Sequence, residues 1–143
     1  MRVISITGYS NSGKTTFITR LIPELAKTFK VASIKHMGHH VFELPEGKDT
    51  TLHFASGAAC SAGIDKEKTV LTLEGTDMYT VLDIYAYLGY DYTVVEGFKD
   101  AGFPCAVIGD LDVPSAIMRN PSVDEVVRRA DEFMEYVPHR KTD

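Results

Sequence analysis

The first third of the chain alternates between two hydrophobic periods. Residues 3–6 form a β-branched apolar run that stops at Thr7 and Gly8, which predicts a buried strand followed by a turn. Apolar residues at helical spacing then predict an amphipathic helix over residues 15–29, bent at its internal proline. A second apolar run predicts a strand at residues 31–34. A strand, a helix and a strand within about 30 residues are typical of a parallel βαβ unit.

The rest of the chain continues this alternation. Residues 36–49 are rich in glycine, proline and charge, which predicts a long surface loop. Ser122 and Glu125 form a capping box that predicts a terminal helix of about four turns, over residues 123–134. The other predicted elements are a short helix from Asp49 or Thr50 to Ser56, strands at 58–62, 69–73, 92–95 and 105–108, and a helix at 78–88 that Gly89 ends.

This order of elements predicts the fold class. Strands that alternate with helices indicate an α/β fold, in which a mainly parallel sheet has helices on both faces. The two strands around the polar turn at residues 65–67 predict an additional antiparallel hairpin. The chain has 143 residues, and one domain has about 100–200. We therefore predict a single nucleotide-binding domain over residues 1–137 and a frayed tail at residues 138–143.

Composition and charge narrow the classes of function. There are 15 Lys and Arg against 20 Asp and Glu, a formal net charge of −5, which argues against a surface that binds nucleic acid or anionic lipid as a whole. Cys60 and Cys105 lack metal-site or CxxC spacing, so we expect free thiols in a reducing cytoplasm. No apolar run approaches the about 18 residues that a membrane span needs. We expect neither nucleic acid nor a membrane as a partner.

Residues 8–15 read GYSNSGKT and match the pattern G-x-x-x-x-G-K-S/T at every fixed position. The glycines allow backbone angles that turn N–H groups toward a phosphate, and the following helix adds the positive end of its dipole. Lys14 supplies a mobile cation, and the Thr15 hydroxyl is a hard oxygen ligand for Mg²⁺. The third position is Ser10, so the dinucleotide pattern G-x-G-x-x-G is not met. The motif predicts a nucleotide phosphate site.

Two acidic residues are candidate ligands for the metal that accompanies a nucleoside triphosphate. Glu96 follows the apolar strand at 92–95, where P-loop proteins place a metal-binding acid; the alternative is a charged residue that merely ends a strand. Asp49 closes the long loop, where it is either a second metal carboxylate or the N-cap of the short helix. The spacing does not separate these two roles of Asp49.

Cationic residues follow the predicted strands. Ligands of open α/β sheets bind at the carboxyl ends of the strands, so these residues indicate a focused anion pocket, with solvated surface side chains as the alternative. They are Lys35, His36, Lys48 and Lys99. His39 and His40 are either ligands or solvent-facing, and the lack of Cys or carboxylate at ligand spacing favours the second.

Six segments, in order along the chain, resemble one family. They are GYSNSGKTT at 8–16, LIPEL at 21–25, VASIKH at 31–36, PEGKDT at 45–50, SGA at 56–58 and VVEGFK at 94–99. Together they resemble the molybdopterin-guanine dinucleotide biosynthesis protein B (MobB) family. The resemblance implies a three-layer P-loop NTPase-like fold and a homodimer that binds GTP. It also implies an accessory role beside the molybdenum cofactor guanylyltransferase, which attaches GMP to molybdopterin.

The resemblance also implies roles for particular residues. The implied phosphate-binding residues are Gly8, Ser12, Gly13, Lys14, Thr15 and Thr16, and the implied Mg²⁺ ligands are Thr15, Asp49 and Glu96. To the nucleotide-binding residues we add Asn11 from the same loop, Lys35 and Lys99. Two departures are visible: His39-His40 stand where the family has His-Asp, and the guanine-reading motif N/T-K-x-D is missing. By position, Asp110 or Asp112 is the candidate acceptor for guanine N1 and N2.

Three functions fit these observations. The main hypothesis is a GTP-binding accessory protein, at most a slow GTPase, because no glutamine or arginine is placed to orient an attacking water. The alternative is an ATP-dependent small-molecule kinase or ligase similar to dethiobiotin synthetase, in which Lys35 binds substrate and the long loop is a lid. The third is a structural homodimer that holds nucleotide without turnover.

Overall fold

The computed structural model describes residues 1–38 and 43–138. By its internal contacts the chain divides into two compact units, one made of residues 1–36 and 78–143 and the other of residues 37–77. Each unit is described by itself, and the single-domain prediction stays a prediction. His39, His40 and residues 139–143 of the predicted tail lie outside the described residues.

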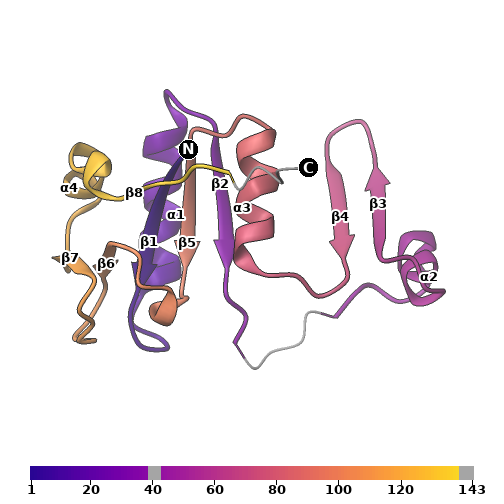
Figure 1. Cartoon of the computed structure of the whole chain (residues 1–143), viewed down its shortest axis with the longest axis horizontal. Helices are drawn as coiled ribbons and strands as arrows, with labels where there is room; N and C mark the ends of the chain where they lie inside the picture. The colour runs from indigo at the N-terminus through magenta and orange to yellow at the C-terminus, as the bar shows by residue number, and fades with distance from the viewer. Residues whose placement is uncertain (39–42, 139–143) are drawn as a thin grey trace. The chain divides into compact units, whose positions relative to one another are not determined.

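The first unit is built on one largely parallel sheet (Figure 1). Its strands lie in the order β2, β5, β1, β6, β7, and all these neighbours are parallel. A short strand, β8, pairs antiparallel with the start of β1. The elements of this unit are β1 (Arg2–Thr7), α1 (Lys14–Ala26), β2 (Val31–Lys35), α3 (Met78–Tyr87), β5 (Tyr92–Glu96), η1 (Lys99–Ala101), β6 (Cys105–Val107), β7 (Ala116–Arg119), α4 (Val123–Arg128), η2 (Ala130–Glu132) and β8 (Met134–Glu135).

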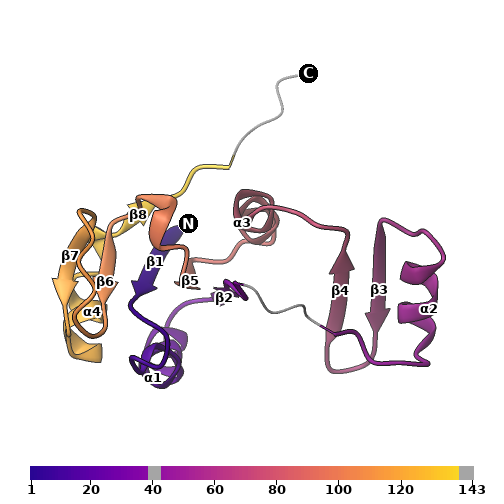
Figure 2. The same cartoon turned by 90° about the horizontal axis from the view of Figure 1, so that it is seen from below.

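Helices cover both faces of this sheet, which confirms the predicted α/β class (Figure 2). Side chains alternate along a strand, so Ile4 and Ile6 of β1 pack with α1 and α4 on one face, while Val3 packs with α3 on the other. In β5, Val94 packs on the face covered by α1 and α4, and Val95 packs on the face covered by α3. Burial on both faces explains why these strands are continuous apolar runs.

The strand order creates a switch point beside β1. The chain leaves β1 through α1 and enters β2, which lies beyond β5, whereas β6 and β7 lie on the other side of β1. In open α/β sheets ligands bind outside the carboxyl ends of the strands at such a point. The loop at residues 8–13 follows the carboxyl end of β1 and therefore lies where a ligand is expected.

Two predicted helices are shorter than expected. Helix α1 ends at Ala26 rather than at residue 29, and the ring of Phe29 packs edge-on against Tyr92, with 4.9 Å between ring centroids. The terminal helix was predicted to reach residue 134, which is wrong, because α4 ends at Arg128. The Ser122 cap is confirmed, since its hydroxyl accepts a hydrogen bond from the Glu125 amide at 3.1 Å.

Tertiary contacts of the following residues explain why the terminal helix ends at Arg128. The buried Phe133 joins the core under α1, and Met134 pairs with Val3 in the sheet. The Arg2 guanidinium also donates to the Phe133 carbonyl oxygen at 3.0 Å. These contacts hold Phe133 in an extended conformation and Met134–Glu135 as the strand β8, although the apolar spacing of this segment fits a helix, so sheet pairing overrides the local pattern here. The sequence analysis also missed β7, a four-residue strand.

The second unit confirms the predicted hairpin. Its helix α2 (Asp49–Ala55) agrees with the prediction, and strands β3 (Cys60–Ile64) and β4 (Thr69–Leu73) pair antiparallel. They form a separate two-stranded sheet, and β3 begins two residues later than predicted. In the turn, Asp65 accepts hydrogen bonds from the amides of Glu67 and Lys68, both at 2.7 Å. These bonds lower the pKa of the Asp65 carboxyl.

Candidate functional site

The loop at residues 8–13 has the backbone that phosphate binding requires. Gly8 has φ +152° and Gly13 has φ +93°, and Asn11 also has a positive φ, +61°. Gly13 is the N-cap of α1 and supplies no side-chain acceptor, so the amides of the first turn are left for an anion. A β-carbon at Gly8 would lie 2.2 Å from the carbonyl oxygen of Ile108. The loop is thus packed against the end of β6.

Ser12 carries an unpaired hydroxyl beside this loop. Its Oγ is buried and has no hydrogen-bond partner among the described residues. A buried hydroxyl without a partner costs about 1–3 kcal/mol, and most such groups in proteins are paired. A phosphate oxygen held by the loop amides would supply the acceptor, which gives a physical reason for Ser12 among the predicted phosphate residues.

The ammonium of Lys14 lies against the loop backbone. Its Nζ donates to the carbonyl oxygen of Gly8 at 3.0 Å and to that of Tyr9. An ammonium bonds an anionic oxygen more strongly than a neutral carbonyl oxygen. A triphosphate in the loop would therefore accept the hydrogen bonds that Lys14 Nζ now donates to the backbone carbonyl oxygens.

The Glu96 carboxylate on β5 contacts side chains from α1 and β2. Its Oε1 accepts a hydrogen bond from Thr15 Oγ1 at 2.9 Å and lies 3.5 Å from Lys35 Nζ. These side chains meet because the register places Glu96 of β5 opposite Ile6 in β1 and opposite Lys35 in β2. The Glu96 side chain is 13% exposed and that of Lys35 is 54% exposed. Thr15, Glu96 and Lys35 are therefore one cluster at the carboxyl edge of the sheet.

The Thr15 and Glu96 oxygens fit Mg²⁺. This ion takes oxygen ligands and is usually held by one or two protein groups together with substrate phosphates and waters. Within residues 1–38 and 43–138, no group of three or more His, Cys, Asp or Glu could hold a metal. A magnesium ion at this pair would therefore depend on the phosphates as co-ligands.

Other predicted residues lie elsewhere. Asp49 is the first residue of α2 in the second unit, and the N-cap of that helix is Lys48, so the N-cap alternative for Asp49 is wrong. Its role as a Mg²⁺ ligand stays a prediction, as do the roles of Asn11 and Thr16. His36 stacks on Phe98 with 4.5 Å between ring centroids.

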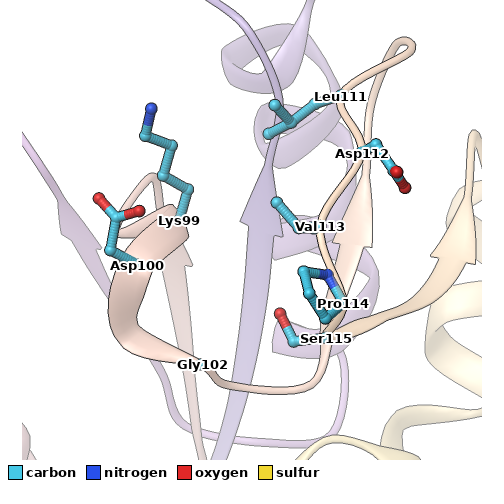
Figure 3. A pocket seen from close by; sticks show the side chains of 8 residues that line it. All are labelled: Lys99, Asp100, Gly102, Leu111, Asp112, Val113, Pro114 and Ser115. Atoms are coloured by element: carbon cyan, nitrogen blue, oxygen red, sulfur yellow. The ribbon is translucent and has the colours of Figure 1, made fainter.

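Lys99 lines a separate cavity (Figure 3). The cavity has a volume of about 720 Å³ and lies between η1 and the segment 111–115; no residue of the loop at 8–15 lines it. Asp112, one of the two guanine candidates, also lines it and is paired with Arg119, with 2.6 Å between Nη2 and Oδ1. A role of Lys99 or Asp112 in nucleotide binding stays a prediction.

Sequence reasoning missed one residue next to the phosphate loop. Asn120, directly after β7, has φ +47° and hydrogen-bonds the backbone of Gly109 through its side chain. The dipeptide Asn120-Pro121 is a turn signal and marks the end of the short strand β7. Its link to Gly109 is eleven residues away in the chain, and no local pattern indicates it.

The family described as "Molybdopterin guanine dinucleotide synthesis protein B" matches residues 3–127. The chain belongs to the MobB family. The predicted resemblance is thereby confirmed, and MobB membership favours the accessory hypothesis over the kinase or ligase alternative.

Three relatives are named as adapter proteins of molybdopterin-guanine dinucleotide biosynthesis, two of them as probable or putative. A Bacillus subtilis protein named as a probable molybdopterin-guanine dinucleotide biosynthesis adapter protein is 34% identical over 140 residues, which cover 92% of this chain and 79% of the relative. The Haemophilus influenzae adapter protein is 34% identical over 131 residues, covering 87% and 71%. A Methanocaldococcus jannaschii relative is 32% identical over 118 residues, covering 82% of this chain and 47% of its own length.

Solved MobB structures share the fold. Bacillus subtilis MobB superposes with a TM-score of 0.72 at 23% identity, covering 95% of this chain and all of that one. A MobB homologue from Bacillus stearothermophilus gives a TM-score of 0.61 at 22% identity, covering 92% and 94%. These similarities confirm the P-loop NTPase-like α/β fold. No helix in the described part of the chain has the length and apolar character to cross a bilayer.

Proposed function

We propose that this protein is a Mg-GTP-binding adapter in the biosynthesis of molybdopterin-guanine dinucleotide. The observation that carries the proposal is the phosphate loop with Lys14 and the Thr15–Glu96 pair at the switch point of the sheet. The adapter role rests on membership of the MobB family and on the names of its relatives. The proposed partner is the guanylyltransferase that transfers GMP.

The proposed mechanism is to hold a triphosphate rather than to consume it. The loop amides and the Ser12 hydroxyl donate to phosphate oxygens, and Lys14 exchanges loop carbonyls for the β- and γ-phosphates. Thr15 and Glu96 would hold the magnesium ion, which would neutralise charge on the phosphates. Lys35, whose Nζ lies 3.5 Å from Glu96 Oε1, would help to orient this carboxylate.

Slow hydrolysis at most is part of the proposal. P-loop GTPases use a glutamine to orient water and an arginine to stabilise the transition state, and this chain contains no glutamine. Of its arginines, Arg119 and Arg129 are bound to carboxylates of Asp112 and of Glu125 and Glu132. The partner enzyme would therefore supply the transfer chemistry.

A homodimer in the cytoplasm completes the proposal. The hairpin exposes the apolar side chains of Ile64 and Leu71 on one face, at 79% and 49%, and that of Val70 on the opposite face, at 58%. A second copy of the chain would cover the face that carries Ile64 and Leu71. Both cysteines are free, and Cys60 is exposed. An exposed free thiol persists in a reducing compartment, which supports the cytoplasm.

Competitive binding tests the proposed nucleotide. With Mg²⁺ present, we expect GTP to bind at least about tenfold more tightly than ATP in calorimetry, a difference of about 1.4 kcal/mol. The purified guanylyltransferase should then be retained by the GTP-bound protein. Equal affinities for GTP and ATP would contradict the guanine part. Tens of turnovers per second without a partner, or a burst of ADP with a small-molecule acceptor, would contradict the adapter part.

Glu96→Gln tests the metal site. The amide keeps the size of the side chain but removes the charge that Mg²⁺ needs, so we expect the gain in GTP affinity on adding Mg²⁺ to fall about tenfold or more. Affinity measured with EDTA should change less than about threefold. Titration calorimetry with and without Mg²⁺ measures both values.

Glu135→Gln is the matched control for this variant. Glu135 is a glutamate in the same sheet, on β8, and its Oε2 lies 4.0 Å from Nη2 of Arg2. Its Mg²⁺ dependence should equal that of the wild type. An equal loss in Glu96→Gln with and without Mg²⁺ would place Glu96 away from the metal.

A further inference from the structure

Asn120 holds the end of β6 through a two-point clamp. The Gly109 amide donates to Asn120 Oδ1 at 2.7 Å, and Asn120 Nδ2 donates to the Gly109 carbonyl oxygen at 3.1 Å. The Asn120 backbone amide also donates to the Val107 carbonyl oxygen at 2.7 Å. The φ of +47° is a conformation that asparagine adopts more readily than most residues. Side chain and backbone together fix the segment 107–109 to the end of β7.

The clamped segment is a wall of the phosphate loop. A β-carbon added to Gly109 would lie 3.3 Å from Cβ of Ser12, and one added to Gly8 would lie 2.2 Å from the Ile108 carbonyl oxygen. Residues 108 and 109 therefore touch the loop at both of its ends. The Asn120 side chain hydrogen-bonds Gly109, so it is linked to the phosphate loop through that one residue.

The strand order decides which part of a nucleotide would lie beside the clamp. Glu96 lies on β5, on one side of β1, whereas Gly109 and Asn120 follow β6 and β7 on the other side. A magnesium ion held by Thr15 and Glu96 would bind the terminal phosphates, so these phosphates would lie toward β5. The nucleoside must then extend in the opposite direction, across the ends of β6 and β7.

The chemistry of the amide fits one edge of a purine. An asparagine side chain offers two N–H donors and two acceptor positions, and the clamp on Gly109 uses one donor and one acceptor position. The second N–H on Nδ2 is suited to an acceptor such as purine N7, which adenine and guanine share. Because the clamp fixes the amide plane, the direction of this N–H is fixed before ligand binds.

We propose that Asn120 is a base-recognition residue, whose Nδ2 donates to N7 of the bound purine while its other contacts hold Gly109 against the phosphate loop. This inference rests on the proposed nucleotide site and extends it to the base. It assigns the recognition of a purine to Asn120 and leaves the choice between guanine and adenine to other groups.

Four affinities test the proposal. Wild type and Asn120→Gly are each titrated with Mg-GTP and with Mg-7-deaza-GTP, in which a C–H replaces N7. Glycine accepts the positive φ, so this variant loses the amide without backbone strain. We expect wild type to bind GTP about fivefold more tightly than 7-deaza-GTP, the worth of one hydrogen bond. The variant should bind both equally.

Ser122→Ala is the matched control at the same corner. It removes the N-cap of α4, whose hydroxyl accepts from Glu125, so it destabilises this region without touching the amide. Its preference for GTP over 7-deaza-GTP should equal that of wild type. A wild type that binds both nucleotides equally, or an Asn120→Gly variant that keeps the preference, overturns the inference.

Magnesium tripolyphosphate separates this inference from the proposed function. It has no base, so Asn120→Gly should lose clearly less affinity for it than for GTP, by about threefold or more, because only the support of the phosphate loop is removed. A loss as large as the loss for GTP would make Asn120 a support of the phosphate loop only and overturn the base role. A wild type that binds neither GTP nor tripolyphosphate would overturn the proposed nucleotide site itself.

Discussion

Lys14→Ala is expected to weaken Mg-GTP binding about a hundredfold while the free energy of unfolding changes by less than about 1 kcal/mol. Each hydrogen bond from a charged group to a ligand is worth about 1.5–3 kcal/mol, and the ammonium would contact two phosphates. Within the described part of the chain, Nζ of the half-exposed Lys14 is bonded only to carbonyl oxygens of the loop, so its loss costs little stability. Titration calorimetry and urea denaturation measure the two quantities.

Lys27→Ala is the control for this variant. Lys27 is the C-cap of the same helix and pairs with Glu24 near the end away from the loop. It removes an equal charge, so a general electrostatic effect would appear in both variants. Only Lys14→Ala should lose GTP. Unchanged GTP affinity in Lys14→Ala would contradict the assignment of the phosphate site.

Gly8→Ala is expected to have the largest effect on stability, a loss of about 3–5 kcal/mol. The added β-carbon would lie 2.2 Å from the Ile108 carbonyl oxygen and 2.7 Å from Ser12 Oγ, at φ +152°. Overpacking costs about 1–3 kcal/mol, and a φ that side chains rarely adopt costs about 1–3 kcal/mol. Backbone carbonyls cannot move aside as a flexible side chain does. Urea denaturation gives the free energy of unfolding.

Two other glycines separate these contributions. A β-carbon at Gly13 would meet nothing within 4 Å, but φ is +93°, so Gly13→Ala should lose only the conformational part, about 1–3 kcal/mol. Gly75 has open space and no such φ, so Gly75→Ala should change stability by less than about 1 kcal/mol. A Gly8→Ala protein as stable as Gly75→Ala would show that the loop does not pack against β6.

Elements whose pattern depends only on residues close together in the sequence could be predicted. The loop between β1 and α1, the Ser122 cap and the β3–β4 hairpin are all confirmed, because turn, cap and alternation are local properties. The terminal helix was predicted too long, since residues 130–134 keep helical spacing while Phe133 and Met134 pack against β1. Strand β7 was missed because its segment contains a single β-branched residue, Ile117.

In the candidate site, too, some residues could be placed from the sequence, whereas the contacts of others depend on the tertiary structure. Lys14 and Thr15 belong to a contiguous motif, so their place at the phosphate loop follows from the sequence. Glu96 was predicted from its position after a strand, but its contact with Thr15 at 2.9 Å depends on β5 lying beside β1. The clamp between Asn120 and Gly109 had no signal in the sequence, because each partner alone reads as a turn residue.

The sequence by itself determined the α/β class, the phosphate loop and the MobB resemblance, since each depends on residue types at short or ordered spacing. Only the tertiary structure decided which side chains meet at the carboxyl edge of the sheet. That choice depends on strand order and register, and a slip of one residue in β5 would turn Glu96 to the other face, away from Thr15 and Lys35. Register is set by packing on both faces of the sheet at once, which no single segment of the chain specifies.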